Sequence, residues 1–356
     1  MIMTCRQALS AGHVISASAM LIRQTDCHLN PKEKVDLNTL HLVDPELLPA
    51  LANSAPLELT PETIVALRRE RQDAAVKQVQ AYRDGGLYIE EHSIDSPDHP
   101  PVRVCVITPV SATPRRMGIL HIHGGGHLFG SPEQSLSLTS VTALRHNCVV
   151  VSVDYRLSPE TVFPGSLEDC YVVLNWMVRQ ADMLGIDQAH IGLMGDSAGA
   201  GLAASLALLA RDRDGPKLAF QNLMFPMLDD RTVTETHPNP VTGEFAWTRE
   251  YNRIGWTALL GEEPGSETIS PYAAPARASN LAGLPPAWIG VGTLDLFLDE
   301  NLDYAQRLIR AGVAVELHVW PGAFHGFHAS DTAAVSLQAR ELRQRWLSRF
   351  NPCPAG

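Results

Sequence analysis

The segment 190–201 constrains the fold of this 356-residue chain more than any other part of the sequence. It reads HIGLMGDSAGAG, a short apolar strand that ends at Gly195 and is followed at once by Ser197 and a helix of small residues. Gly195 and Gly199 stand two residues on either side of Ser197, where a side chain would collide with neighbouring backbone in a tight strand-to-helix turn. The helix N-terminus behind Ser197 would offer backbone N–H groups and a positive dipole to a developing negative charge. The segment therefore predicts an α/β fold with Ser197 as a nucleophile.

Apolar runs rich in Val and Ile alternate with helical patterns through the rest of the chain. Strands without polar alternation are typical of a sheet covered on both faces, and their alternation with helices is typical of parallel crossover connections. The predicted strands are residues 102–108, 117–123, 148–153, 190–194, 218–225, 286–291 and 313–319. The predicted helices are residues 166–180, 198–211, 299–310 and 332–350. The expected architecture is a mostly parallel central sheet with helices on both faces.

The N-terminal part of the chain is expected to be a helical cap segment. Residues 57–83 have a helical pattern, with Thr60 placed to cap the first turn and Pro61 at the first helical position. No strand pattern occurs before residue 86. We therefore expect residues 1–85 to form this segment and residues 86–356 to form the catalytic domain.

A second cap element is expected between two of the predicted strands. About sixty residues separate the strand that ends near Pro226 from the next one, which is too long for an ordinary loop. Residues 231–268 are therefore predicted to be a cap insertion, with a helix over 249–260. Three of its aromatic residues either line an acyl pocket or pack inside the cap, and they are Phe245, Trp247 and Trp256.

Composition and charge exclude several classes of function. Hydrophobic residues make up 45% of the chain and charged residues 19%, which is ordinary for a globular protein. The 28 basic and 39 acidic side chains leave a net charge of −11, which repels phosphate backbones and anionic lipids, so neither nucleic acid nor a membrane is an expected partner. The six cysteines show neither zinc-finger nor disulfide-framework spacing. Residues 8–22 are the only candidate export signal, but they contain His13 and three serines, so the expected location is the cytoplasm.

The segment 119–130, ILHIHGGGHLFG, carries a second chemical signal. A predicted strand runs into His123 and then into three consecutive glycines, Gly124, Gly125 and Gly126. Glycines free the backbone N–H groups to point at one spot, and such a loop donates to the oxyanion beside a serine nucleophile. His123 is expected to hydrogen-bond the backbone and shape this loop. The loop precedes the serine in the chain, as hydrolases of this kind require.

A serine nucleophile needs a base and an acid that orients the base. His325 lies after the last predicted strand, inside the tightly turned sequence Phe-His-Gly-Phe, and is preferred over His328, which is expected to open the following helix. Asp295 lies after the preceding strand. It is preferred over Asp299 and Glu300, because acids in the first turn of a helix commonly offset the helix dipole. The predicted serine, acid and histidine follow one another in the order of an α/β-hydrolase.

With these motifs the chain resembles the bacterial hormone-sensitive-lipase family of carboxylesterases. The matching motifs occur in the family's order over about residues 100 to 350. They are His123-Gly124-Gly125-Gly126, the sequence DYRLSPE at 154–160, Phe163-Pro164 through Glu168-Asp169-Cys170, Gly195-Asp196-Ser197-Ala198-Gly199, the sequence SPYA at 270–273, the sequence DLFLDE at 295–300, and His325-Gly326-Phe327. His127 stands where the family usually has an aromatic residue, which bears on the shape of the pocket.

The resemblance implies an α/β-hydrolase fold and a serine carboxylesterase that hydrolyses short- to medium-chain esters through an acyl-enzyme intermediate. It implies Ser197, Asp295 and His325 as the catalytic triad. The oxyanion hole would be formed by the backbone amides of Gly125, Gly126 and Ala198. The family implies no metal and no organic cofactor, its partner is a small-molecule ester, and a homodimer is common in such families.

Two other functions are compatible with parts of the sequence. His121, His123 and His127 form an H-x-H-x-x-x-H pattern like that of a metal-dependent hydrolase, and the first two would share one face of a strand. The pattern is weak, because no Asp or further His follows closely. A non-catalytic relative of the fold that binds a small ligand is disfavoured, because the serine, the acid and the histidine are all present.

Overall fold

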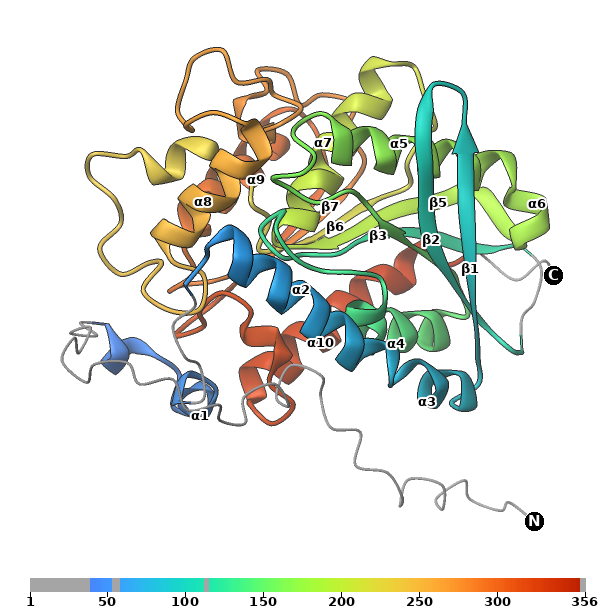
Figure 1. Cartoon of the computed structure of the whole chain (residues 1–356), viewed down its shortest axis with the longest axis horizontal. Helices are drawn as coiled ribbons and strands as arrows, with labels where there is room; N and C mark the ends of the chain where they lie inside the picture. The colour runs from blue at the N-terminus through green and yellow to red at the C-terminus, as the bar shows by residue number, and fades with distance from the viewer. Residues whose placement is uncertain (1–38, 53–57, 112–114, 353–356) are drawn as a thin grey trace.

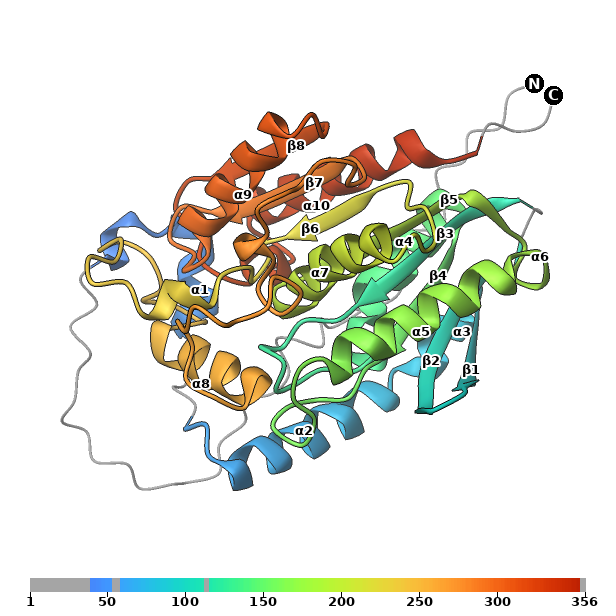
Figure 2. The same cartoon turned by 90° about the horizontal axis from the view of Figure 1, so that it is seen from above.

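The computed structural model describes residues 39–52, 58–111 and 115–352. The strands in these ranges are β1 Leu87–Ser96, β2 His99–Pro109, β3 Arg116–Ile122, β4 Val149–Asp154, β5 Ile186–Asp196, β6 Gln221–Met224, β7 Ala287–Gly292 and β8 Val315–Trp320. They form one eight-stranded sheet in the order β1-β2-β4-β3-β5-β6-β7-β8 (Figures 1 and 2). The pairs β1–β2 and β2–β4 are antiparallel, and every other pair is parallel. The predicted mostly parallel sheet of an α/β-hydrolase fold is confirmed.

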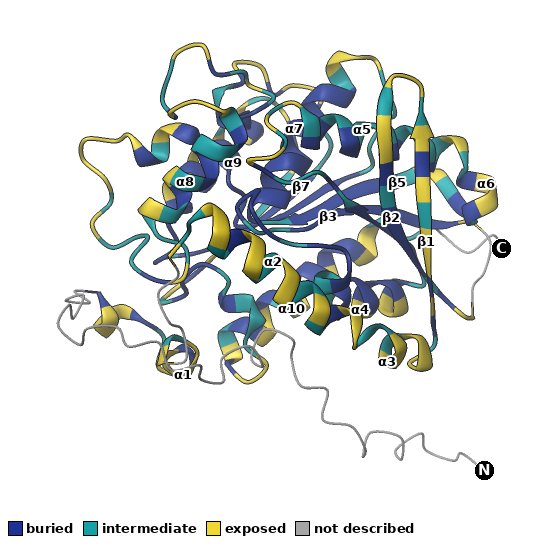
Figure 3. Cartoon of the chain, in the orientation of Figure 1, coloured by how far each residue is buried: buried dark blue, intermediate teal, exposed yellow. Residues whose placement is uncertain are grey.

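Helices cover both faces of this sheet, as predicted. One face carries α5 Gly165–Arg179, α7 Ala198–Asp212 and α9 Leu298–Arg310, and the other carries α4 Leu136–His146 and α10 Ala334–Leu347 (Figure 1). Alternate residues of a strand therefore enter different cores. On β4, Val149, Val151 and Val153 belong to the core beside α5 and α7, whereas Val150 belongs to the core beside α4 and α10. The sheet is accordingly buried along most of its length (Figure 3).

The strand β1 was not predicted from the sequence. Its residues LYIEEHSIDS contain no continuous apolar run, and only Leu87, Ile89 and Ile94 are buried. The strand lies at the edge of the sheet and pairs with β2 alone. An edge strand needs fewer apolar residues than a central one, so a search for Val- and Ile-rich runs does not find it.

The helix α4 was also missed, and its composition explains why. Its sequence LSLTSVTALRH is rich in Ser, Thr and Val, which are poor helix formers. The hydroxyls of Thr139 and Thr142 donate to the carbonyls of Ser135 and Leu138, four residues earlier. Packing against the sheet therefore stabilises a helix that local propensity does not predict.

The single helix predicted over residues 57–83 is two helices, α2 Pro61–Val76 and α3 Val79–Asp84. The expected cap is present, because the Thr60 side chain accepts a hydrogen bond from the Thr63 backbone N–H. The break comes at Gln78, whose N–H donates to the carbonyl of Ala75, three residues back, and so leaves the α-helical ladder. Neither Gly nor Pro marks this break in the sequence.

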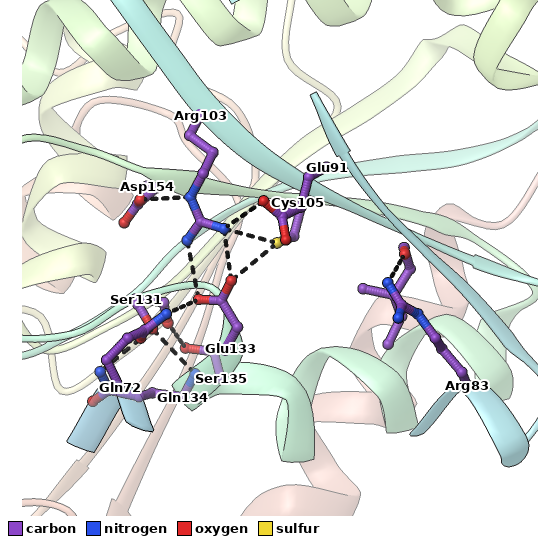
Figure 4. A network of polar contacts seen from close by, with 11 residues as sticks. Gln72, Arg83, Glu91, Arg103, Cys105, Ser131, Glu133, Gln134, Ser135 and Asp154 are labelled. Carbon is purple, nitrogen blue, oxygen red and sulfur yellow. Dashed lines mark hydrogen bonds and ion pairs between the residues drawn. The ribbon is translucent and has the colours of Figure 1, made fainter. Parts of the chain in front are cut away.

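A polar network attaches α2 to the sheet (Figure 4). Gln72 of α2 donates to Glu133 at 3.0 Å and accepts from Ser131. Arg103 of β2 donates to Glu133 at 2.7 Å and to Asp154 at 2.8 Å. Burial alone would raise the pKa of Glu133, but the hydrogen bonds from Arg103 and Gln72 lower it to about 2. The network fixes α2 beside the segment that follows the three glycines.

Within the predicted insertion 231–268, one helix has the expected bounds, α8 Arg249–Leu260. A 3-10 turn at Asp230–Val233 precedes it, and most of the remaining residues form turns and irregular backbone, so the segment is less helical than expected. The candidate export signal at 8–22 lies outside the described residues. In the three described ranges, no helix is long and apolar enough to cross a membrane.

Candidate active site

Ser197 is the only residue between β5 and α7. Its φ of 56° and ψ of −124° form a conformation that residues with a side chain rarely adopt, and its backbone N–H donates to the carbonyl of Met224. A Cβ atom at Gly195 would lie 2.5 Å from the carbonyl oxygen of Gly199. A Cβ atom at Gly199 would lie 2.2 Å from the carbonyl oxygen of Ile122. No side chain fits at either glycine, as the spacing of the two glycines around Ser197 predicts.

One hydrogen-bonded series joins the side chains of Ser197, His325 and Asp295. His325 Nε2 lies 2.9 Å from Ser197 Oγ, and His325 Nδ1 lies 2.8 Å from Asp295 Oδ2. Asp295 follows β7 and His325 follows β8, so the ends of neighbouring parallel strands carry both side chains to the turn after β5. Asp295 is 0% exposed, and its second oxygen accepts from the Phe297 backbone N–H at 2.9 Å. The structure thus brings together three residues that are far apart in the chain.

The alternative histidine lies elsewhere. His328 Nε2 is 3.7 Å from Asp196 Oδ2, and His328 packs against the ring of Phe225. It belongs to a short 3-10 turn, Phe327–Ala329, whereas α10 begins at Ala334. The expectation that His328 opens the closing helix is therefore wrong.

The two alternative carboxylates also lie outside the hydrogen-bonded series. Asp299 is exposed in the first turn of α9 and accepts from Asn239 at 3.3 Å. Glu300 is buried and accepts from the Leu228 N–H and the Thr232 hydroxyl. Burial raises the pKa of Glu300 well above its ordinary value.

The three glycines approach the serine closely. A Cβ atom at Gly124 would lie 2.7 Å from the carbonyl oxygen of Asp196 and 3.4 Å from the Cβ of Ser197. Gly125 and Gly126 have φ values of 123° and 62°, which favour glycine. Within the described part of the chain, the backbone N–H groups of Gly125, Gly126 and Ala198 donate to no other residue. Unpaired N–H groups on both sides of a serine can bind a negatively charged oxygen.

Aromatic rings surround His325, and two of them were not found from the sequence. The ring centroids of Phe225, Phe297 and Trp247 lie 4.6, 5.1 and 6.3 Å from that of His325. Trp247 also lies against the glycine loop, because a Cβ atom at Gly126 would be 2.1 Å from its ring. Of the three aromatic residues considered for an acyl pocket, Trp247 therefore lies beside the candidate site. The other two, Phe245 and Trp256, are buried against Phe324 and His127.

A buried arginine below the turn was also missed. Arg343 of α10 is 1% exposed and donates to the carbonyl of Gly195 and to the side chain of Asn222. Its Nη1 lies 2.6 Å from Asp196 Oδ1, an ion pair whose angles fall outside hydrogen-bond geometry. Burial alone would raise the pKa of Asp196, but the charge of Arg343 lowers it below its ordinary value. Arg343 thus holds the residues on the N-terminal side of Ser197.

His121 and His123 have hydrogen-bond partners that do not suit a metal site. His121 Nδ1 lies 2.8 Å from the Ser152 hydroxyl, and His123 Nδ1 lies 2.9 Å from the carbonyl of Gly124, which confirms the expected backbone contact of His123. Burial lowers the pKa values of His121 and His127 to about 3. Among the residues that the structure describes, no group of three His, Cys, Asp or Glu side chains could hold a metal ion. The metal-dependent alternative therefore loses its structural basis.

Comparison with known families agrees with the fold. A family model described as the alpha/beta hydrolase fold matches residues 119–329, which include the glycine loop, the serine turn and both strand-end residues. The chain belongs to the α/β-hydrolase family. The resemblance to hormone-sensitive-lipase-type carboxylesterases is confirmed by this match and by the relatives of the chain.

Three similar proteins illustrate where this α/β-hydrolase stands within the family. The esterase LipI of Mycobacterium tuberculosis is 32% identical over 295 residues, which cover 80% of this chain and 88% of LipI. The structure of a bacterial heroin esterase has a TM-score of 0.79 and 37% identity, and the match covers 88% of this chain and 100% of that one. Esterase LipW from Mycobacterium marinum has a TM-score of 0.76 and 34% identity, with coverages of 87% and 96%. The predicted enzyme class, a carboxylic ester hydrolase, is confirmed.

Proposed function

We propose that this α/β-hydrolase is a serine carboxylesterase that works through an acyl-enzyme intermediate. Ser197 is the nucleophile, His325 the general base and acid, and Asp295 the residue that orients His325. The observation that carries the proposal is the hydrogen-bonded series from Ser197 Oγ through both nitrogens of His325 to Asp295 Oδ2, at 2.9 and 2.8 Å. Such a series lets a hydroxyl lose its proton while it attacks.

The reaction follows from this series. Ser197 Oγ attacks the ester carbonyl carbon, and its proton passes to His325 Nε2. Asp295 accepts the Nδ1–H hydrogen bond, so it holds the imidazole in the tautomer whose Nε2 can accept, and it stabilises the imidazolium that forms. The imidazolium then gives its proton to the alcohol oxygen as the carbon–oxygen bond of the ester breaks. A water molecule attacks the acyl-enzyme with the same two proton transfers, which releases the acid and restores Ser197.

The oxyanion of each tetrahedral intermediate would be bound by the backbone N–H groups of Gly125, Gly126 and Ala198. Their lack of any other partner in the described residues supports this role. Ala198 begins α7, so the partial positive charge of the helix N-terminus adds to its N–H group. Preorganised donors of this kind stabilise the transition state more than the ground state.

Covalent labelling tests the proposal. A fluorophosphonate should phosphonylate Ser197 and stop ester hydrolysis in step with the fraction of protein labelled, because the reagent reacts with activated serines. Peptide mass spectrometry locates the label. Inhibition without a label on Ser197 would contradict the proposal, and protein that neither hydrolyses p-nitrophenyl acetate nor reacts would support a non-catalytic ligand-binding protein instead.

We also propose that the N-terminal helices and the insertion 231–268 form a cap that restricts the enzyme to short- and medium-chain esters. Ile64 of α2 packs with Leu128 and Phe129, and Ile254 and Ala258 of α8 pack against the same cluster. The two candidate cap segments therefore share one apolar cluster with the glycine loop. On this proposal, activity on p-nitrophenyl esters should fall steeply from butyrate to palmitate. Equal rates on both would contradict it.

The oligomeric state and the location stay predictions from the sequence. A homodimer is tested by light scattering on the purified full-length chain, where a mass of about one chain would contradict it. A cytoplasmic location is tested by fractionation of the source cells.

A further inference from the structure

We propose that Arg68, on the N-terminal helix α2, is a positioning residue for the oxyanion hole. Directly and through Ser158, it fixes two peptide groups whose N–H groups donate to the carbonyl of Gly125. The direction of that carbonyl sets the direction of the Gly126 N–H, which belongs to the same peptide group. This inference rests on the proposed function, because it assigns Arg68 a part in the same reaction. It gives α2 a role in the rate of the chemical step, beyond that of a cover over the substrate.

Arg68 reaches from α2 to two loops of the catalytic domain. Its Nε donates to the carbonyl of Leu128 at 2.6 Å, and its Nη2 donates to the carbonyl of Ser158 at 2.5 Å. Its Nη1 pairs with Glu160 at 2.7 Å. The Arg68 side chain is 20% exposed and that of Glu160 is 57% exposed, so the two carbonyl contacts lie on the buried side of the guanidinium. The planar guanidinium makes these three contacts from three different nitrogens in a rigid fork, a geometry that the single nitrogen of an ammonium group does not have.

The first contact leads directly to the oxyanion loop. The peptide group between Leu128 and Phe129 accepts from Arg68 through its carbonyl and donates to the carbonyl of Gly125 through its N–H, at 3.0 Å. The carbonyl of Gly125 belongs to the same peptide group as the N–H of Gly126. In a planar trans peptide the carbonyl and the N–H point in opposite directions, so a fixed Gly125 carbonyl fixes the direction of the Gly126 N–H.

The second contact reaches the same carbonyl by another route. The Ser158 N–H donates to the carbonyl of His127 at 2.9 Å. That carbonyl belongs to the same peptide group as the Leu128 N–H, which donates to the carbonyl of Gly125 at 3.0 Å. Arg68 holds the carbonyl of Ser158. Two peptide groups therefore donate to the Gly125 carbonyl. One of them accepts a hydrogen bond from Arg68 itself, and the other accepts one from the N–H of Ser158, whose own carbonyl accepts from Arg68.

The packing of α2 keeps Arg68 in this position. Arg71 lies over the ring of Phe129, with its guanidinium carbon 4.8 Å from the ring centroid. Ile64 is buried against Leu128 and Phe129. Gln72 binds Ser131 and Glu133 further along the same segment (Figure 4). One face of α2 thus contacts the loop over residues 128–133, while the opposite face is exposed (Figure 3).

The expected effect of Arg68 follows from when the oxyanion hole acts. The Gly126 N–H binds charge that develops only in the transition state, so a misdirected N–H should lower kcat and leave KM nearly unchanged. Complete loss of one oxyanion donor costs about 10²–10³ in kcat. Loss of Arg68 displaces the donor without deleting it, so we expect kcat to fall by at least about 10-fold and by less than that limit.

The test compares three single variants with p-nitrophenyl butyrate as substrate. Arg68→Met keeps the apolar stem and removes every donor. Arg69→Met is the matched control, because Arg69 is the next residue on α2 and is exposed. Glu160→Gln removes the surface ion pair and leaves both carbonyl contacts in place. Rates are expressed per active site titrated with a fluorophosphonate, so that misfolded protein does not count.

Arg68→Met should lose at least about 10-fold in kcat with KM within about twofold of the parent, and both controls should keep kcat within about twofold. Its affinity for an alkylboronic acid, which forms a tetrahedral adduct, should fall by the same factor as kcat/KM. An unchanged kcat, or a raised KM with unchanged kcat, would overturn the inference. If Arg68→Met does not fold, Arg68→Lys decides, since an ammonium carries its donors on one nitrogen and cannot reproduce the rigid fork of Nε and Nη2, so kcat should still fall. Failure of the parent enzyme to be titrated at Ser197 would instead overturn the proposed function.

Discussion

The replacement Asp295→Asn tests how the hydrogen-bonded series works. Asp295 Oδ1 accepts from the Phe297 N–H, a group that can only donate, so an asparagine must keep its oxygen on that side. Its NH₂ group must then face His325 Nδ1, where Asp295 Oδ2 lies at 2.8 Å. The amide donates to Nδ1, which moves the imidazole proton to Nε2. Nε2 then donates to Ser197 and can no longer accept the serine proton.

The loss should be large, because the variant traps the wrong tautomer. Serine protease triads lose about 10⁴ in kcat on the same replacement, which corresponds to about 5.4 kcal/mol in the activation free energy. We expect a loss of this order for Asp295→Asn at pH 7. The site is buried and the two side chains have the same shape, so the fold should persist.

Steady-state hydrolysis of p-nitrophenyl butyrate measures kcat, and a thermal melt checks the fold. Asp299→Asn is the matched control, because Asp299 is exposed four residues further along the chain and accepts only a 3.3 Å contact from Asn239 in the described structure. Its kcat should stay within about twofold of the parent. A loss of less than about 10-fold in Asp295→Asn, or a larger loss in Asp299→Asn, would refute the assignment of the acid.

Three further predictions concern stability and specificity. Arg343→Met should destabilise the fold by about 3–5 kcal/mol in urea denaturation, because it leaves Asp196 without its cation, and a loss under about 1 kcal/mol would contradict this. Burial lowers the pKa of His121 to about 3. The unfolded chain therefore binds a proton that the folded chain does not, and this group should cost about 1.4 kcal/mol of stability for each pH unit as the pH falls from about 6.5 to 3. His121→Asn should reduce the slope of the unfolding free energy against pH accordingly, and an unchanged slope would contradict this prediction. Trp247→Ala should raise kcat/KM for the octanoate ester relative to the acetate ester by at least about 10-fold, because its ring limits the space beside Gly126, and an unchanged ratio would show that another residue sets the limit.

The serine turn and the glycine loop could be predicted because their requirements are local. Gly195 and Gly199 are needed by backbone atoms that lie within a few residues or on the adjacent strand, so their spacing is visible in the sequence. His325 and Asp295 could be placed because parallel strands deliver their C-terminal ends to one edge of the sheet. The position of each residue directly after a predicted strand was therefore enough to propose that they meet.

The supporting arginines could not be predicted, because their partners are distant in the chain. Arg343 lies in a helix with many charged residues and contacts residues 148 positions away, and Arg68 contacts the loop 60 residues further on. An arginine on an amphipathic helix is most often exposed, and only the packing of α10 and α2 shows that these two are not. The aromatic rings of Phe225 and Phe297 were missed for the same reason, since nothing local to them points to His325.

The most direct test of the account is the turnover of Ser197→Ala. Removal of the nucleophile from such a unit costs about 10⁶ in kcat, so the folded variant should hydrolyse p-nitrophenyl butyrate about 10⁶-fold more slowly than the parent. The variant should keep the parent's melting temperature within about 2 °C, since the lost hydroxyl contacts only His325 among the described residues. Turnover of more than about one hundredth of the parent's, in protein shown by mass spectrometry to lack Ser197, would contradict the assignment of Ser197 as the nucleophile.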